Sequence, residues 1–349
     1  GEGTLSIYCP LVSGGSWMAP RTPVKCNMSE FEGTLKPQLP YKDNRFTLDN
    51  SYGLPKATMD IPDGMEVQNT GKTFAIGKVT GTGALGGLVD FGNGVSGNNT
   101  WKVGNETNYR WSGKITGTST AFVKIGSGKL TVDGNWDNTG SVKVAEGELC
   151  LTSGKVIGTG AVTVDKDARL SGVTGTASLT NSSYTINGEL VVGVFANATS
   201  GKINFGGKNV TISSTGKYVV GKGSYSNTTI DDINTLTING TIEVVFASSY
   251  TPKDGDVVTL WTANKFAGTP NYVLPNLPLG MAWNMSKVSE GILTIVADPT
   301  AIDVVPFGAK YGHNDIYDLK GQLVRKNATS TEGLPSGVYF RNGKKIVVK

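Results

Sequence analysis

The stretch Gly128-Lys-Leu-Thr-Val132 is the first of five copies of one short phrase, a glycine followed by apolar and polar residues in alternation. The later copies are Gly147-Glu-Leu-Cys-Leu151, Gly188-Glu-Leu-Val-Val192, Gly216-Lys-Tyr-Val-Val220 and Gly240-Thr-Ile-Glu-Val244. Their glycines are separated by 19, 41, 28 and 24 residues, and the widest gap contains a degenerate copy, Asp167-Ala-Arg-Leu170. A short strand that returns about every 20 residues is typical of a β-solenoid. The alternation predicts that the apolar positions of the phrase, such as Leu149 and Val192, face inward.

Stacking of successive coils explains how such short strands can be stable. One coil alone has no partners for its backbone N–H and C=O groups, whereas coils about 4.8 Å apart bond to one another. Glycine is needed where the chain turns a corner or runs close to the next coil. We therefore expect an all-β protein built on a single-stranded, right-handed parallel β-helix of about ten coils, with a small C-terminal β-sandwich-like domain.

Proline marks the borders of this stack. All 14 prolines lie at or before Pro62 or at or after Pro252. Because proline cannot donate a hydrogen bond within a sheet, the proline-free stretch predicts strands that are paired on both sides. We expect an N-terminal cap over residues 1–30, the β-helix over 31–251, a C-terminal cap over 252–298 and a separate β segment over 299–349.

The charge and the hydropathy of the chain argue against two classes of partner. The net charge is +4, and the residues from 310 onward alone carry +5, so the rest of the chain is nearly neutral. A neutral body offers no continuous positive surface to a phosphate backbone, and we expect no nucleic-acid partner. No window approaches the ~18 consecutive apolar residues of a membrane-spanning helix. We expect a monomer with no membrane span and no cofactor.

The cysteines and the single histidine limit the chemistry that the chain can carry. Three cysteines are too few for a disulfide scaffold and lack the spacing of a zinc site. Cys9 and Cys26 could pair in an exported protein, and we expect Cys150, which lies between two leucines, to be an unpaired strand residue. His313 is the only histidine and lies in the C-terminal segment, so the β-helix has no Ser-His-Asp or Cys-His arrangement.

Two short motifs match ligand-binding patterns, but we expect both to be turns. Gly81-Thr-Gly-Ala-Leu-Gly86 fits the dinucleotide pattern GxGxxG, yet no helix follows it to offer its N-terminus to a phosphate. Asp133-Gly-Asn-Trp-Asp137 is similar to the start of a calcium loop. Its sixth position is Asn138 rather than Gly and its twelfth is Val144 rather than Glu, so we expect no metal site.

Two pairs of carboxylates leave an enzymatic alternative open. Asp231-Asp232 and Asp165-x-Asp167 could serve as acid and base on a polysaccharide held in a groove. The plainer interpretation is charge pairing along a loop face. In that interpretation Glu146 should lie near Lys166, one coil further on.

Residues 115–134, Ile-Thr-Gly-Thr-Ser-Thr-Ala-Phe-Val-Lys-Ile-Gly-Ser-Gly-Lys-Leu-Thr-Val-Asp-Gly, with Val142-Lys-Val144 and Gly147-Glu-Leu-Cys-Leu151 after them, resemble the autotransporter-associated β-strand repeat of bacterial passenger domains. The segment 100–113 is similar to the strand pair that precedes this repeat, and 274–295 is similar to the segment that closes such passengers. The resemblance covers roughly residues 30–298 and implies an exported β-helix.

Only 51 residues follow Asp298, far fewer than the membrane barrel of an autotransporter requires. These residues instead resemble the C-terminal sorting domain of type IX secretion, which implies a small β-sandwich that guides export to the cell surface. The implied sorting-signal residues are Tyr317, Leu319, Gly321, Leu334, Pro335, Gly337, Tyr339, Gly343 and Lys345.

Four aromatic residues could form a platform for sugars, because flat rings suit the apolar faces of pyranoses. They are Trp101, Tyr109, Trp111 and Trp136. The resemblance gives two of these positions a strand-packing role, so we favour stacking inside the solenoid over ligand binding.

We expect an exported cell-surface or secreted protein whose β-helix forms a rigid, non-catalytic surface for display or adhesion. Its partner would be a host or bacterial surface protein or glycan. The alternative is a polysaccharide-binding or polysaccharide-degrading β-helix. A groove with clustered carboxylates and outward aromatics would favour the alternative, whereas short, uniformly polar loops would favour display.

Overall fold

The computed structural model describes residues 3–8, 24–38, 45–49, 51–69, 73–87, 89–90, 94–95, 99–172, 175–193, 201–224, 226–298, 314–341 and 344–349. These residues form strands, one 3-10 turn (η1, Val288–Glu290) and no α-helix, which confirms the all-β expectation. They include no helix long and apolar enough to cross a membrane. The chain divides into two compact units, one of Gly1–Leu277 and Trp283–Val296 and one of Pro278–Ala282 and Ala297–Lys349.

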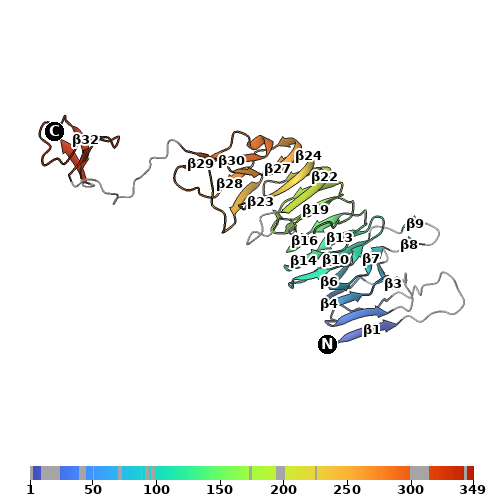
Figure 1. Cartoon of the computed structure of the whole chain (residues 1–349). Helices are drawn as coiled ribbons and strands as arrows, with labels where there is room; N and C mark the ends of the chain where they lie inside the picture. The colour runs from blue at the N-terminus through green and yellow to red at the C-terminus, as the bar shows by residue number, and fades with distance from the viewer. Residues whose placement is uncertain are drawn as a thin grey trace. The chain divides into compact units, whose positions relative to one another are not determined.

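The larger unit is a parallel β-solenoid of about eight turns (Figure 1). One of its sheets, which we call the second sheet, has eight strands. Their order is β11 (Tyr109–Trp111), β14 (Lys129–Val132), β16 (Glu148–Leu151), β18 (Arg169–Gly172), β21 (Glu189–Val192), β23 (Lys217–Lys222), β25 (Thr241–Phe246) and β28 (Asn271–Val273). The five copies of the phrase and the degenerate copy are the six consecutive strands β14 to β25, paired in parallel. The predicted stacking of coils is therefore confirmed.

The first sheet lies beside the second and continues past it toward the N-terminus. Its order is β1 (Thr4–Tyr8), β2 (Thr34–Gln38), β4 (Leu54–Ile61), β6 (Thr73–Gly81), β10 (Thr100–Val103), β13 (Ala121–Lys124), β15 (Val142–Val144), β17 (Val162–Val164), β20 (Ser183–Ile186), β22 (Gly201–Ile212), β24 (Thr228–Ile238) and β27 (Trp261–Ala267). β19 (Thr176–Ser178) also pairs with β22. A third sheet has the order β12 (Lys114–Ile115), β7 (Ala84–Gly87), β5 (Glu66–Asn69) and β3 (Arg45–Leu48), and β8 (Val89–Asp90) pairs with β9 (Gly94–Val95).

The prediction of about ten coils was too high. Later coils use more than 20 residues each, because β22 has 12 residues and β24 has 11. The segment expected as an N-terminal cap, residues 1–30, contributes a strand to the first sheet. Thr4–Tyr8 pair in parallel with Thr34–Gln38, so parallel stacking begins inside that segment.

The core of the solenoid consists of apolar side chains aligned from coil to coil. In the second sheet, Leu130, Leu149, Leu170 and Leu190 lie next to one another in register, and all four are fully buried. Val192 is fully buried as well, so both residues that the alternation placed inside, Leu149 and Val192, are confirmed there. Burial of each such side chain contributes roughly 1.5–3 kcal/mol.

Corner glycines allow the coils to approach. Gly147 has a φ of +63°, and a Cβ there would lie 2.5 Å from the carbonyl oxygens of Gly126 and Gly128 on the preceding coil. Any other residue would have to adopt a left-handed backbone and displace that coil. The repeated glycine of the phrase is thus required by geometry at this position.

Two small sheets complete the described residues. In the segment expected to cap the solenoid, β26 (Val257–Thr259), β30 (Ile292–Ala297) and β29 (Met281–Asn284) form a three-stranded sheet, and Val258 and Leu293 are buried in the solenoid core. The C-terminal unit holds β32 (Leu323–Arg325), β31 (Ile316–Tyr317), β33 (Gly337–Arg341) and β34 (Lys344–Val348), in that order and antiparallel. Its described residues thus form a small antiparallel sheet with a core of its own.

Candidate functional surface

The four aromatic residues considered as a sugar platform all lie inside the solenoid. Trp101, Tyr109, Trp111 and Trp136 are at most 9% exposed. The indole N–H of Trp101 donates to the carbonyl oxygen of Gly86 at 3.0 Å. The ring centroid of Trp136 lies 4.6 Å from that of Phe122 and 6.0 Å from that of Trp111. These rings pack between coils, so the stacking role is confirmed and they cannot meet an external ligand.

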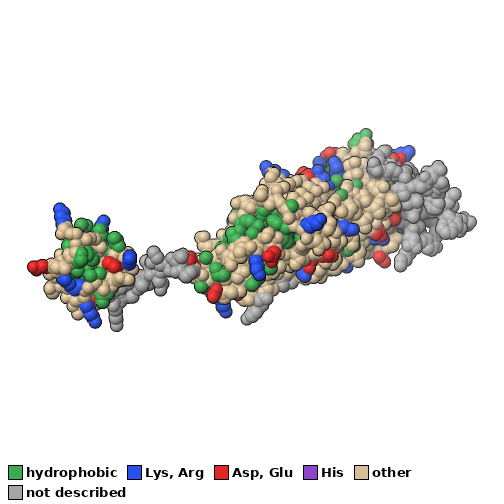
Figure 2. All heavy atoms as spheres, turned by 90° about the horizontal axis from the view of Figure 1, so that it is seen from above, with side chains coloured by type: hydrophobic (Ala, Val, Ile, Leu, Met, Phe, Trp, Pro, Cys, Tyr) green, Lys and Arg blue, Asp and Glu red, His purple; other side chains and the backbone are tan. Residues whose placement is uncertain are grey.

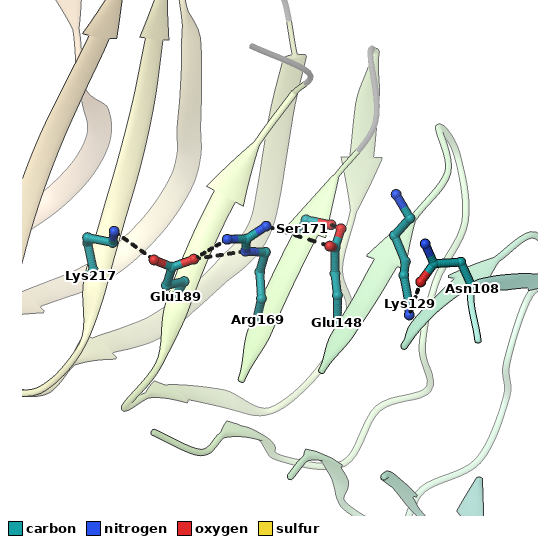
Figure 3. Close-up of polar contacts among 7 residues, drawn as sticks. All are labelled: Asn108, Lys129, Glu148, Arg169, Ser171, Glu189 and Lys217. Carbon is teal, nitrogen blue, oxygen red and sulfur yellow. Dashed lines mark hydrogen bonds and ion pairs between the residues drawn. The ribbon is translucent and has the colours of Figure 1, made fainter. Parts of the chain in front are cut away.

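The outer face of the second sheet carries a row of alternating charges, which we call the charge row (Figure 3). It consists of Lys129, Glu148, Arg169, Glu189 and Lys217, which are direct neighbours in the parallel register. Each directly precedes a fully buried leucine or tyrosine in its copy of the phrase. The alternation of the strand therefore points all five outward.

Four of the five residues of the charge row, Glu148, Arg169, Glu189 and Lys217, form ion pairs with one another. Arg169 donates to Glu189 Oε2 through Nε at 2.8 Å and Nη2 at 2.6 Å, and Lys217 Nζ lies 2.6 Å from Glu189 Oε1. Arg169 also lies 3.7 Å from Glu148, whose other oxygen accepts a hydrogen bond from the Ser171 hydroxyl at 2.6 Å. A network of this kind stabilises the stack more than isolated surface pairs do.

The pairing fixes the protonation state of Glu189. Burial by itself would raise the pKa of Glu189, but hydrogen bonds from Lys217 and Arg169 outweigh it and lower the pKa below its ordinary value. Hydrogen bonding to Glu189 in turn raises the pKa of Lys217, against a smaller effect of burial. Glu189 is therefore ionised at neutral pH and cannot donate a proton as a general acid.

A groove of about 470 Å³ lies beside the end of the charge row. Its lining residues are Lys166, Asp167, Gly188, Glu189, Thr215, Gly216, Lys217 and Thr241. The lining offers ammonium groups, carboxylates and hydroxyls, and it includes no aromatic ring. Such a surface can hydrogen-bond a polar ligand but gives no platform on which a sugar ring could stack.

Neither proposed carboxylate pair is brought together as an acid and a base. Asp167 lines the groove, but Asp165 forms an ion pair with Lys143 at 2.8 Å. Asp231 forms an ion pair with Lys202 at 2.7 Å, and Asp232 follows it at a bulge of β24 with a φ of +52°. The groove therefore combines Asp167 with Glu189, a pair that the sequence did not suggest.

The two motif-like turns also lack a ligand-binding arrangement. Gly81 ends β6 with a φ of +81°, and the strand β7 follows it instead of a helix. Asp133 accepts a hydrogen bond from Arg110 at 3.1 Å, which lowers the pKa of its carboxyl, and Asp137 bonds to Lys114 at 3.0 Å. Among the residues that the structure describes, no three His, Cys, Asp or Glu side chains gather as metal ligands.

A buried lysine is the feature that the sequence reasoning missed. Lys124 Nζ donates to the carbonyl oxygens of Ile125 and Gly126 at 2.7 Å each and to that of Glu146 at 3.3 Å. Burial lowers its pKa to about 8, partly opposed by Glu146 and Glu148. The sequence could have predicted this burial, because Lys124 lies two residues after Phe122 in β13 and therefore points to the same, inner side.

The expected pair of Glu146 and Lys166 is wrong. The carboxylate of Glu146 accepts the backbone N–H of Gly126 at 3.0 Å, on the coil before it.

Among the cysteines, Cys26 is exposed and free, Cys150 is buried and free, and Cys9 lies outside the described residues. Burial raises the pKa of Cys150.

The sorting-signal residues fall into three groups. Leu334 packs on the small core and Tyr339 belongs to it, while the Tyr339 hydroxyl donates to the carbonyl oxygen of Pro335 at 3.0 Å. Leu319 is exposed and Gly321 has a φ of +74°, both in the turn between β31 and β32. The remaining sorting-signal residues that the structure describes, Tyr317, Gly337 and Lys345, lie in strands. Gly343 and His313 lie outside the described residues.

Comparison of the chain with protein-family models and with curated proteins found no match.

Proposed function

We propose that the chain is an exported protein, held at the cell surface or secreted, whose solenoid is a rigid, non-catalytic support for display or adhesion. The charge row carries this proposal. Its carboxylates are ion-paired, and the one that reaches the groove, Glu189, has a pKa below its ordinary value. Ion pairs of this kind stabilise the stack, and an ionised Glu189 cannot act as a proton donor. The partner would be a host or bacterial surface protein or glycan.

The proposal includes a role for the C-terminal unit in type IX secretion. Its support is the resemblance of residues 316–349 to that sorting domain, together with a core that is separate from the solenoid core. The cluster of Leu334, Pro335 and Tyr339 would then maintain the shape that the export machinery reads.

Surface exposure tests this proposal. The full chain is produced in a bacterium with type IX secretion, and whole cells are treated with a protease that cannot enter them. We expect the wild-type chain to be digested and Tyr339→Ala to remain inside. Lys326→Ala, an exposed change in the same unit, serves as the control. Equal exposure of the wild-type chain and Tyr339→Ala would refute the sorting role.

The groove favours one alternative, a polysaccharide-binding or polysaccharide-degrading function. Asp167 and Glu189 are two carboxylates on one groove, which is the minimum that glycoside hydrolysis needs. Purified protein is incubated with a panel of polysaccharides, and the release of reducing ends is measured. The display function predicts no release. Release that Asp167→Asn and Glu189→Gln each abolish would establish the alternative.

A further inference from the structure

The pairing register of the C-terminal sheet separates its side chains into two faces. Tyr317 pairs with both Leu323 and Phe340, and Val338 pairs with Val347. Because paired residues point to the same side and alternate residues of a strand share a side, Tyr317, Val338, Phe340 and Val347 occupy one face. We call it the open face. Leu323 adjoins this face through its pairing with Tyr317, at an irregularity of the register.

The opposite face is the one that holds the small core. Ile316 and Tyr339 point there and are buried with Ala328, and Leu334 packs against them. The segment that carries Ala328 and Leu334 is attached to this side, since the Ala328 backbone N–H bonds to Asn314 and its carbonyl accepts from Arg341. The described part of the chain thus covers one face of this sheet.

The open face is apolar and exposed. Leu323 is 51% exposed, Phe340 39% and Val347 60%. Leu319, in the adjoining turn, is 70% exposed. Figure 2 shows hydrophobic side chains gathered on this small unit, with Lys and Arg side chains and a few Asp and Glu side chains around them. A small soluble unit rarely leaves this many large apolar side chains in water unless they meet a partner.

The charges at the open face are positive. Lys345 pairs with Phe340 on this face, and Lys320 is next to Leu319 in the turn. Neither side chain forms an ion pair with the described residues. Nearby acids are engaged elsewhere: Asp315 is buried and accepts the Asn327 N–H at 2.7 Å, and Asp318 accepts the N–H groups of its own turn.

We propose that the open face docks on an anionic lipid surface. Apolar side chains with lysines beside them match the boundary between acyl chains and phosphate headgroups, where lysine can keep its ammonium group at the phosphates. A second copy is a poorer occupant, because it would bring Lys345 and Lys320 against equal charges. The inference rests on the proposed surface location, where the open face would meet anionic lipids.

Vesicle binding by the full chain tests the inference. Protein is sedimented with vesicles of phosphatidylethanolamine and phosphatidylglycerol, and separately with vesicles of phosphatidylcholine alone. We expect binding to the anionic vesicles that weakens as salt is added. Phe340→Ser with Val347→Ser should weaken it about tenfold or more, and Lys345→Gln about fivefold. The control is Val257→Ser, a similarly exposed valine of the solenoid unit, which should bind as the wild type does.

Several results would overturn the inference. One is no binding of the wild-type chain to anionic vesicles, and another is equal binding to phosphatidylcholine. A dimer in sedimentation velocity that Phe340→Ser with Val347→Ser abolishes would assign the face to a second copy. Binding to soluble polyglutamate with no binding to vesicles would assign it to an acidic protein. Protease exposure on cells is measured independently, so these outcomes leave the sorting proposal standing.

Discussion

At the scale of single residues, Lys124 shows how a charged group can link two coils from the inside. Its ammonium group donates to Ile125 and Gly126, which follow β13, and to Glu146, which follows β15. The strands β13 and β15 are neighbours in the first sheet. Three backbone carbonyls that would otherwise lack these donors are thus satisfied by one side chain, at the cost of burying a charge.

The lowered pKa of Lys124 predicts a pH dependence of stability. The folded chain holds this proton more weakly than the unfolded chain, whose lysine has the ordinary pKa of 10.5. Unfolding therefore takes up a proton between pH of about 8 and 10.5, and the contribution of Lys124 to the free energy of unfolding rises across that window. Urea unfolding gives the free energy of unfolding of the wild type and of Lys124→Met. The wild-type value should rise relative to that of Lys124→Met as the pH increases through this window. A difference that stays constant would contradict the prediction, and Lys102→Met, an exposed lysine one coil earlier, is the control.

At the scale of a strand, the inward positions of the second sheet are the most sensitive to charge. Leu149→Asp would bury a carboxylate between Leu130 and Leu170, with no partner. We expect it to lower the free energy of unfolding by about 3 kcal/mol or more. Thermal unfolding measures the loss. Thr163→Asp introduces the same group on the outer side of β17, beside Lys143, and should change the stability by less than about 1 kcal/mol.

The charge row should stabilise the stack modestly and in a salt-dependent manner. Glu189→Gln removes the carboxylate shared by Arg169 and Lys217, which lie on either side of it and keep only Glu148 and Glu243 as acidic partners. We expect a loss of about 1 kcal/mol in the free energy of unfolding at low ionic strength and a smaller loss at high salt. In the wild type this contribution is present above the ordinary carboxyl pKa of 4.5 and is lost as the pH falls through the lowered folded value. The same loss at both salt concentrations would show that the pairing is not electrostatic.

Strand identity and side-chain direction could be read from the sequence, whereas contacts between coils could not. The phrase repeats the same alternation after each glycine, so it predicted that Leu149 and Val192 face inward. In β11 the alternation covers only three residues, so by itself it did not decide between an inward Trp111 and a sugar-binding one. Corner residues can bond to the coil before or after them, and their spacing does not say which. Glu146 bonds backward to Gly126, so its expected pairing with Lys166 failed.

At the scale of the whole chain, two hydrophobic cores of very different size support the two units. The core of the solenoid is one continuous cluster that includes buried residues from Leu35 to Leu293. The C-terminal unit has a cluster of three buried residues, Ile316, Ala328 and Tyr339. No apolar residue is shared between the two clusters. The cooperative unfolding of one unit therefore need not involve the other.

The difference between the cores predicts two separate unfolding transitions. A sheet with a core of three buried residues removes little apolar surface from water, so we expect the C-terminal unit to unfold at the lower temperature. Tyr339→Ala should lower this first transition and leave the second in place, whereas Leu149→Asp should lower only the second. Calorimetry gives both transitions, and hydrogen exchange followed by mass spectrometry assigns them to residues 314–349 and to the solenoid strands. A single transition that both substitutions shift would mean that the two cores unfold as one unit.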